Sequence, residues 1–277
     1  MRFEETRVMN FEGALRGMRN PMNSWHKSDS FFTIFADGMD EEWKAETIHQ
    51  ITEQYLKDMV EGDYDAAYHE MSDYLWDMST RCMQLGEPAA ENVVIGPNDM
   101  DLAKRLIAGG TEHRKFLRQI MVSVDITAPL YWWKEFDTYK VGTTANSTST
   151  MHKLASTPIT RECFEMDDYQ DIPIETLYYN EDSEEPRYDY HTDGFIDELC
   201  ETLEQLRQKY LETKDKRYWK ELVRWLPNGW LQTRTVTMNY ENLRSMYHQR
   251  ENHKLTEWHS FCDWVKTLPY AQEFIID

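Results

Sequence analysis

A segment rich in aromatic residues runs directly into a short polar stretch in the middle of the chain. The aromatic segment covers 129–137 (Pro-Leu-Tyr-Trp-Trp-Lys-Glu-Phe-Asp), and the polar stretch covers 141–149 (Val-Gly-Thr-Thr-Ala-Asn-Ser-Thr-Ser). Just before them, residues 120–126 alternate between apolar and polar side chains, which is typical of a half-buried strand. This order predicts a strand, a buried aromatic helix and a loop whose backbone N–H groups and hydroxyls can bind a phosphate.

Composition favours a soluble chain with a sizeable core. The 277 residues are 40% hydrophobic and 13% aromatic, which excludes a disordered composition. No window approaches the roughly 18 apolar residues of a membrane span. The four cysteines have no metal-ligand spacing and no signal peptide precedes them, so we expect reduced thiols in a cytoplasmic protein.

The formal net charge of −20 limits the partners of this chain. A nucleic-acid backbone would be repelled, so we expect no nucleic-acid partner. A nucleotide ligand would need a local cluster of Arg, Lys or N–H donors to reverse the field at its site.

The patterns outside the central region predict mostly helices. Residues 1–35 are expected to be irregular, either as an arm packed across the surface, which we favour, or as a loop that closes over a ligand. The helical spacing of apolar residues predicts an added N-terminal helical hairpin over 40–61 and 64–85, joined at Gly62-Asp63. Further helices are expected near 98–108, 193–213, 215–225, 239–250 and 255–266, a strand at 233–238 and a long acidic connection over 155–191. No linker divides the chain clearly, so we expect one domain over 1–277, of the α+β class, with a mixed or antiparallel sheet flanked by helices.

Two motifs accompany the aromatic segment. The turn Thr111-Glu112-His113-Arg114 precedes the predicted strand, and the triplet Thr138-Tyr139-Lys140 precedes the polar stretch. Near the C-terminus, Leu226-Pro227 is followed twelve residues after the proline by Asn239, and eleven residues later by Arg250. These three segments resemble the flavin-dependent thymidylate synthase (thymidylate synthase complementing protein) family over roughly residues 111–258.

The resemblance implies specific roles for several residues. It implies cofactor contacts for His113, Tyr139, Lys140 and Asn239, and binding of the substrate nucleotide by Asn146, Ser147, Ser149, Arg224 and Arg250. Ser149 matches the serine at the pyrimidine ring, and Arg250 matches the arginine that holds the nucleotide phosphate. These two are therefore the expected catalytic residues. An arginine can bind a phosphate through two parallel hydrogen bonds, but Arg250 can also pair with a nearby acid such as Glu257.

This chain departs from the family pattern at several positions. The family's Arg-His-Arg triplet is replaced by Thr138-Tyr139-Lys140, and Glu241 replaces an arginine beside the flavin. Because a carboxylate repels a pyrophosphate, Glu241 calls for compensation, for which the candidates are Arg16, Arg19, Arg234 and Arg244. Tyr139 can stack on a ligand ring or extend the aromatic core of 131–136, and we favour the core interpretation.

The family resemblance implies the reductive methylation of dUMP to dTMP with FAD as cofactor, and with NADPH and methylenetetrahydrofolate as co-substrates. It also implies a homotetramer whose sites are shared between subunits. Two alternatives remain: a relative that acts on another pyrimidine nucleotide, and a non-catalytic binding or scaffold protein that kept the fold. No histidine pair has metal-ligand spacing, so we expect no metal.

Overall fold

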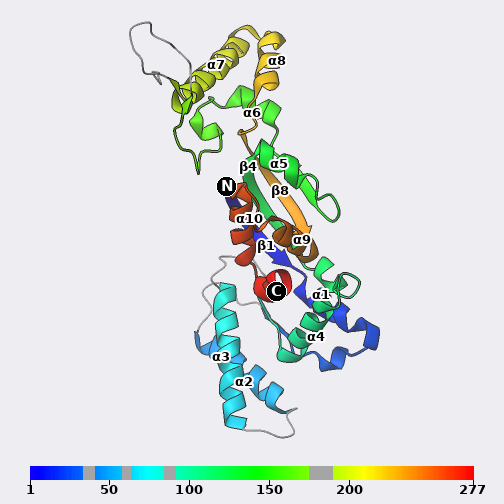
Figure 1. The fold of residues 1–277 in the computed structure, drawn as a ribbon. Helices are drawn as coiled ribbons and strands as arrows, with labels where there is room; N and C mark the ends of the chain where they lie inside the picture. The colour runs from blue at the N-terminus through cyan, green and yellow to red at the C-terminus, as the bar shows by residue number, and fades with distance from the viewer. Residues whose placement is uncertain (34–40, 58–63, 84–91, 175–189) are drawn as a thin grey trace, which may run out of the picture. The chain divides into compact units, whose positions relative to one another are not determined.

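The structure, a computed structural model, describes the chain except for residues 34–40, 58–63, 84–91 and 175–189 (Figure 1). It combines helices with antiparallel pairs of strands, as expected for the α+β class. In chain order the helices and strands are β1 (Arg2–Met9), α1 (Phe11–Arg19), η1 (Asn20–Met22), η2 (Trp25–Lys27), β2 (Phe31–Thr33), α2 (Glu41–Lys57), α3 (Tyr64–Met83), β3 (Asn92–Val94), α4 (Pro97–Ala108), η3 (Lys115–Arg118), β4 (Met121–Pro129), α5 (Leu130–Phe136), β5 (Thr144–Ser147), α6 (Thr150–Ser156), η4 (Arg161–Cys163), β6 (Pro173–Ile174), β7 (Tyr190–His191), α7 (Thr192–Thr213), α8 (Lys216–Trp225), β8 (Leu231–Asn239), α9 (Tyr240–Arg250), α10 (Thr256–Lys266) and η5 (Gln272–Ile276).

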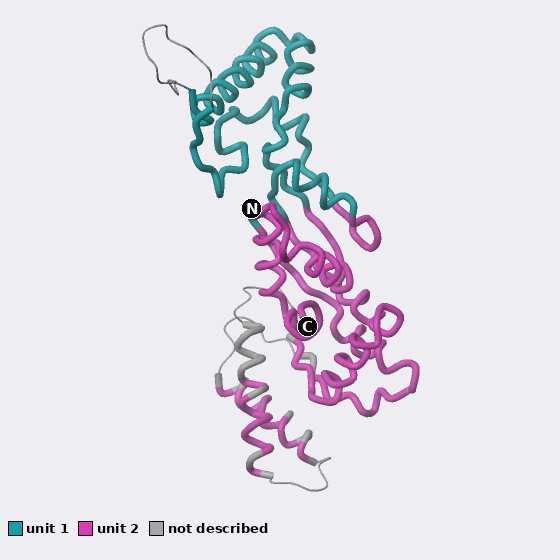
Figure 2. The backbone as a smooth tube through the Cα atoms, viewed as in Figure 1, with its two compact units in different colours: residues 1–2, 126–138, 146–234 teal, residues 3–125, 139–145, 235–277 magenta. Residues whose placement is uncertain are grey.

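The chain forms two compact units, each assembled from separate stretches of sequence (Figure 2). Unit 1 comprises residues 1–2, 126–138 and 146–234, and unit 2 comprises residues 3–125, 139–145 and 235–277. The boundary between the units falls within β4, within β8 and at each end of the segment 139–145. A single domain over the whole chain stays a prediction.

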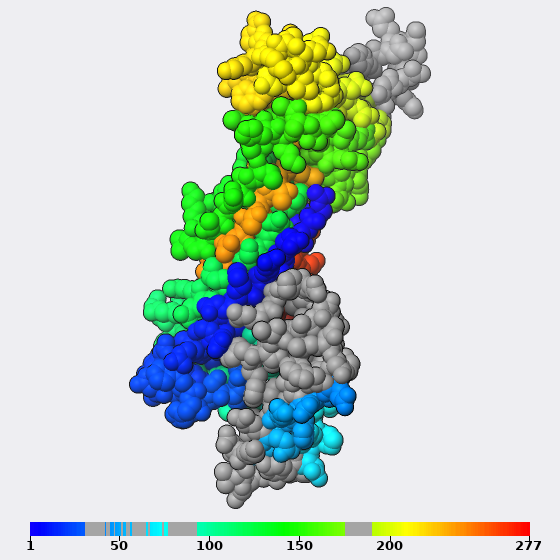
Figure 3. Space-filling view, turned by 180° about the vertical axis from the view of Figure 1, so that it is seen from behind, coloured from blue at the N-terminus to red at the C-terminus, as the bar shows by residue number. Residues whose placement is uncertain are grey.

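The largest sheet has four strands in the order β1-β4-β8-β5. β4 begins with the predicted alternation of half-buried and buried residues, and its last residues, from Ile126 to Pro129, are all buried. β1 lies at one edge of the sheet, and Figure 3 shows it exposed on the face seen there. Two smaller antiparallel pairs join β2 to β3 and β6 to β7.

The expectation of an irregular N-terminus is wrong, because β1, α1, η1, η2 and β2 together occupy most of it. Two glycines in the α1 sequence argue against a helix, yet both allow close approach of other side chains. An added Cβ at Gly13 would lie 2.2 Å from Oδ1 of Asn10, and one at Gly17 would lie 2.4 Å from Oε1 of Gln119. The α1 face that includes Phe11 and Leu15 is fully buried, so packing overrides the low helix propensity of glycine.

The predicted helices near 98–108, 193–213, 215–225, 239–250 and 255–266 are confirmed as α4, α7, α8, α9 and α10. Helices α2 and α3 lie within the predicted helical ranges 40–61 and 64–85 and contact one another, and their assignment as an added hairpin stays a prediction. Their predicted joint at Gly62-Asp63 lies outside the described residues. The expected acidic connection is described up to residue 174 and contains only short elements there. Among the helices that the structure describes, none has the length and apolarity needed to cross a membrane.

The aromatic segment forms the helix α5, as predicted. Trp132, Trp133 and Phe136 are buried, and the indole N–H of Trp133 donates to the carbonyl of Gln232 at 2.9 Å. The polar stretch after it is not simply a loop, because Thr144–Ser147 forms the edge strand β5 beside β8. The side chains of β5 are all exposed, so its sequence needs no alternation of apolar and polar residues. The sequence pattern therefore did not predict this strand.

A buried ion pair connects α1 to α4 in unit 2. Nε of Arg19 donates to Oδ1 of Asp99, whose other carboxylate oxygen accepts hydrogen bonds of 2.6 Å from the hydroxyls of Ser28 and Ser30. Arg19 is 5% exposed and Asp99 is fully buried. Asp29 in turn accepts the backbone N–H groups of Asn98 and Asp99 in the first turn of α4. This network attaches the segment 28–30 to α4.

We predict that Asp99→Asn lowers the free energy of unfolding by about 3–5 kcal/mol, because it leaves the guanidinium of Arg19 buried without a counter-charge. The control is Asp101→Asn on the same helix, whose carboxylate pairs with Arg105 and is 66% exposed. We expect it to change stability by no more than about 0.5 kcal/mol. Urea unfolding measures both variants, and equal effects would contradict this assignment.

Candidate functional site

The start of α9 is fixed by reciprocal hydrogen bonds between two asparagines. The side chain of Asn239 accepts the backbone N–H of Asn242 at 3.0 Å, and the side chain of Asn242 accepts the backbone N–H of Asn239 at 3.3 Å. Such a capping box satisfies two donors that a helix start leaves unpaired. The predicted flavin contact Asn239 is 8% exposed and therefore has a structural role at the junction of β8 and α9.

The same two asparagines hold the segment 139–145. Nδ2 of Asn242 donates to the carbonyl of Val141 at 2.7 Å. Gly142 has φ +74°, and an added Cβ there would lie 2.9 Å from both Nδ2 of Asn239 and Oδ1 of Asn242. Glycine is therefore required at this position by both backbone conformation and space. The adjoining hydroxyl of Thr143 is buried and has no hydrogen-bond partner among the residues that the structure describes.

Arg250, at the last turn of α9, is half-buried against aromatic rings. Its Nε donates to the hydroxyl of Tyr139 at 2.8 Å, and its guanidinium carbon lies 4.7 Å from the centre of the Trp258 ring. The Tyr139 ring contacts Trp258 edge-on at 6.1 Å between centroids. The structure thus gives Tyr139 a different role from the expected extension of the 131–136 cluster. These contacts fix the orientation of the guanidinium plane.

Glu241, in the first turn of α9, is neutralised by an arginine that the sequence analysis did not select. Arg114 forms a two-pronged ion pair with it, with Nε and Nη2 donating at 2.8–3.1 Å. Both side chains are mostly buried, with 21% and 13% of their surface exposed. Arg114 therefore pairs with Glu241 in place of the expected Arg16, Arg19 or Arg234, of which Arg19 pairs with Asp99 and Arg234 with Asp137. Of the four arginines expected to compensate Glu241, Arg244 does lie near it.

Arg244 lies on the same side of α9 and adds a second positive charge near this pair. Its Nη1 donates to the carbonyl of Ile275 at 2.9 Å. Burial lowers the pKa of Arg244, and the nearby charge of Arg114 lowers it further, whereas Glu241 acts in the opposite direction. Arg114 and Arg244 therefore place two guanidinium charges near the start of α9, with the carboxylates of Glu241 and Asp277 as their acidic neighbours.

His113 and Lys140 are both exposed. The ring of His113 lies against Gly109, where an added Cβ would approach it to 3.1 Å. Lys140 makes no ion pair or hydrogen bond with any residue that the structure describes. Its ammonium is therefore available beside the segment that the two asparagines hold.

The remaining predicted residues belong to unit 1. Asn146 and Ser147 lie on the exposed strand β5, and Ser149 caps α6, its Oγ lying 2.8 Å from Nδ1 of His152. Arg224 is half-exposed on the last turn of α8 and pairs with Glu221. Nε1 of Trp225 also donates to Glu221, so this carboxylate serves two neighbours.

Among the predicted residues, the structure brings Tyr139 and Arg250 into contact. Both belong to unit 2, as does Asn239, which lies beside Gly142. The predicted nucleotide residues 146–149 and Arg224 belong to unit 1. Convergence of Ser149 and Arg250 on one ligand stays a prediction.

Three residues of the α9 site were not indicated by the sequence, and they are Arg114, Thr143 and Trp258. The signal for Arg114 was its place next to His113. Asn242 was expected to lie on the same helix face as Asn239 and Arg250, and its position three residues after Asn239 is the spacing of a capping box.

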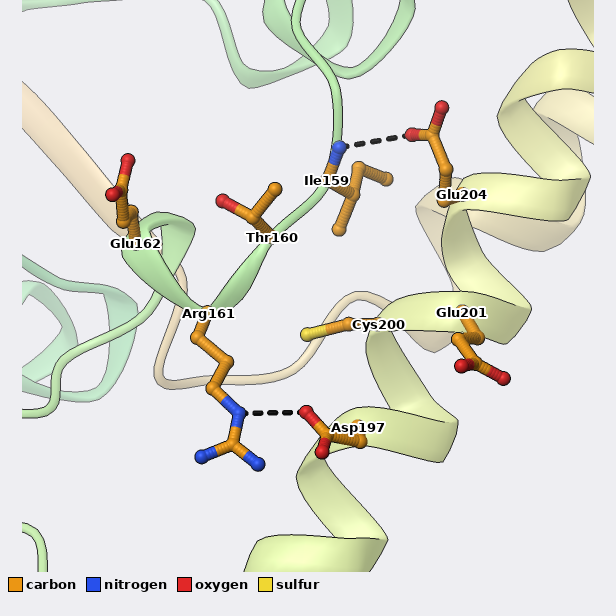
Figure 4. A pocket seen from close by; sticks show the side chains of 8 residues that line it. All are labelled: Ile159, Thr160, Arg161, Glu162, Asp197, Cys200, Glu201 and Glu204. Atoms are coloured by element: carbon orange, nitrogen blue, oxygen red, sulfur yellow. Dashed lines mark hydrogen bonds and ion pairs between the residues drawn. The ribbon is translucent and has the colours of Figure 1, made fainter.

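None of the predicted site residues lines any of three cavities in the described part of the chain. One of about 490 Å³ is lined by residues of η4 and α7 (Figure 4), a second of about 430 Å³ adjoins Arg161 and Glu162, and a third of about 170 Å³ lies between β1 and the end of α10. No group of three or more His, Cys, Asp or Glu side chains within the described residues is arranged to hold a metal ion.

Comparison with known proteins identifies the fold. No protein-family model and no curated protein sequence matches the chain. A crystal structure of Thymidylate Synthase X (ThyX) from Helicobacter pylori, with FAD and dUMP, is similar with a TM-score of 0.54 and 12% sequence identity, over 99% of this chain and 97% of that chain. A second structure, of flavin dependent thymidylate synthase ThyX from the same organism complexed with FAD and dUMP, has a TM-score of 0.45 and 16% identity over 71% of this chain and 91% of that chain. The first of these likenesses shows a ThyX-like fold.

We predict that Asn242→Ala lowers the free energy of unfolding by about 1–2 kcal/mol, because it removes half of the capping box and the bond to Val141. Ser245→Ala, one turn later on the exposed side of α9, is the matched control and should change stability by less than about 0.5 kcal/mol. Urea unfolding measures both. Limited proteolysis should also cut within 139–145 faster in Asn242→Ala, and unchanged cleavage would contradict the proposed attachment.

Proposed function

We propose that this chain is a flavin-dependent thymidylate synthase-like enzyme that methylates dUMP to dTMP, with methylenetetrahydrofolate and NADPH as co-substrates and FAD as cofactor. The observation that carries the proposal is the orientation of Arg250, whose guanidinium is held by the Tyr139 hydroxyl and the Trp258 ring. Because this guanidinium is already held in one orientation, binding a phosphate costs less side-chain conformational entropy. The ThyX-like fold is consistent with this assignment.

The residues at the start of α9 fit an anionic cofactor. Arg114 neutralises Glu241, Arg244 lies near Glu241 and Asp277, and the ammonium of Lys140 is unpaired among the described residues. The buried hydroxyl of Thr143 needs a hydrogen-bond partner, which a phosphate oxygen would supply.

In this proposal Lys140 and Thr143 bind the FAD phosphates, with His113, Tyr139 and Asn239 as neighbours of the cofactor. FAD, when bound, supplies the hydride and one-carbon chemistry. The chain's own side chains supply charge and orientation.

The nucleotide would be held by Arg250 and Arg224 at its phosphate and by Asn146, Ser147 and Ser149 at its base and sugar. These residues belong to both units and include the expected catalytic pair Ser149 and Arg250. The proposed assembly is a homotetramer, so the residues of one site are free to come from different copies of the chain.

A second candidate function is action on another pyrimidine nucleotide by the same fold. It is favoured by Tyr139, which replaces a family histidine and whose hydroxyl is already engaged by Arg250 and Gln249. A thermal-shift comparison of dUMP with other pyrimidine nucleotides, each with FAD, separates the two. A non-catalytic scaffold predicts no shift with any of them.

The first test is the colour of the purified protein. We predict a flavin absorption spectrum, and release of FAD when the protein is denatured. A protein that stays colourless after incubation with FAD would contradict the cofactor assignment. Growth of a thymidine-requiring host lacking its own synthase would then test the complete reaction.

We predict that Arg250→Lys weakens dUMP binding by about 10- to 150-fold, because lysine cannot form the two-pronged bond worth about 1.5–3 kcal/mol. The control is Arg217→Lys, whose guanidinium is 90% exposed on α8 and pairs with Asp215. It should leave binding unchanged. Calorimetric titration with dUMP measures both, and equal affinities for the two variants would exclude Arg250 from the site.

A further inference from the structure

Ser149 lies where the chain leaves the edge of the four-stranded sheet. The strand β5 ends at Ser147, and the backbone N–H of Thr148 still donates to the carbonyl of Thr233 on β8 at 2.9 Å. The helix α6 then begins at Thr150. The position of Ser149 therefore depends on what holds the two threonines that flank it.

The side chain of Gln232, on β8, holds both of these threonines. Its Nε2 donates to the carbonyl of Thr148 and to Oγ1 of Thr150, each at 3.0 Å. Gln232 is 9% exposed, so little water competes for these hydrogen bonds. One amide group thus fixes both neighbours of Ser149.

The orientation of this amide follows from the chemistry at its two ends. Its Oε1 accepts a hydrogen bond from Nε of Arg234 at 2.9 Å. A guanidinium can only donate and a backbone carbonyl can only accept, so the amide oxygen must face Arg234 and the nitrogen must face Thr148. The reverse orientation would place donor against donor and acceptor against acceptor.

The far end of the amide is anchored on the buried helix α5. Nη1 of Arg234 donates to Asp137 at 2.6 Å, and its guanidinium carbon lies 4.2 Å from the centre of the Trp133 ring. The indole N–H of Trp133 donates to the backbone carbonyl of Gln232 at 2.9 Å. The backbone and the side chain of Gln232 are therefore both attached to a rigid part of unit 1.

We propose that Gln232 is a positioning residue of the nucleotide site, which holds Ser149 in place through Thr148 and Thr150. This inference rests on the proposed function. Glutamine suits the position because its amide donates twice and accepts once. A glutamate could accept from Arg234 but could not donate to Thr148, and a methionine of similar length could do neither.

Hydrogen exchange of the ligand-free full chain, read by mass spectrometry, tests the positioning itself. We expect the backbone amides of 148–152 to exchange at least about tenfold faster in Gln232→Met and in Gln232→Glu, because both variants lose the two donors. Thr150→Val removes one acceptor with little change of shape and should give a smaller increase. The control is Gln205→Met on α7, whose exposed side chain forms no hydrogen bond with any described residue. Unchanged exchange in the Gln232 and Thr150 variants, or an equal increase in the control, would overturn the inference.

Calorimetric titration with dUMP in the presence of FAD tests the role in nucleotide binding. We expect Gln232→Met to weaken dUMP binding by at least about tenfold, because the contacts of Ser149 depend on its position. FAD affinity, measured by flavin absorbance, should not change, since the proposed phosphate contacts Lys140 and Thr143 belong to unit 2. A general loss of structure would weaken both ligands and would overturn the inference.

The two measurements separate failure of the inference from failure of the proposed function. Equal dUMP affinity in the parent protein and Gln232→Met would overturn the role of Gln232 and leave the proposed function standing. A parent protein that binds no dUMP would contradict the proposed function and, with it, the role of Gln232 in nucleotide binding. Faster exchange of 148–152 would then show only a local structural attachment.

Discussion

The capping box between Asn239 and Asn242 determines the geometry on which the α9 site depends. It ends β8, begins α9 and, through the bond to Val141, holds the segment 139–145 against the start of the helix. That segment carries Tyr139, the residue that orients Arg250. A few hydrogen bonds of modest individual strength therefore connect the direction of the helix, the position of the loop and the orientation of the guanidinium.

An ion pair neutralises the carboxylate of Glu241 at the start of α9. The carboxylate of Glu241 would repel a phosphate, but Arg114 forms a bidentate ion pair with this carboxylate and Arg244 lies nearby. Charge-assisted pairs of this geometry are among the stronger polar interactions in proteins. Glu241 was the substitution least compatible with nucleotide binding. Its counter-charge is Arg114, which lies in the turn that contains His113.

Much of the fold was predictable from periodicity, because α4, α5, α7, α8, α9 and α10 carry strong apolar patterns with clear ends. Helix α1 was not predictable, because Gly13 and Gly17 suggest a loop. The structure shows that these glycines make room for the side chains of Asn10 and Gln119. β5 was hidden because an exposed edge strand has no apolar face. Arg250 was predicted, but its contact with Trp258 and the pairing of Arg114 with Glu241 depend on contacts between separate segments, which spacing alone does not reveal.

The central claim is that Arg250 receives the phosphate of a pyrimidine nucleotide. A crystal structure of the protein with dUMP and FAD tests it most directly, since it also places residues 146–149 relative to α9. The account predicts a dUMP phosphate oxygen within hydrogen-bond distance of the Arg250 guanidinium. A nucleotide phosphate bound elsewhere, with Arg250 still contacting only protein atoms in every copy of the chain, would contradict it.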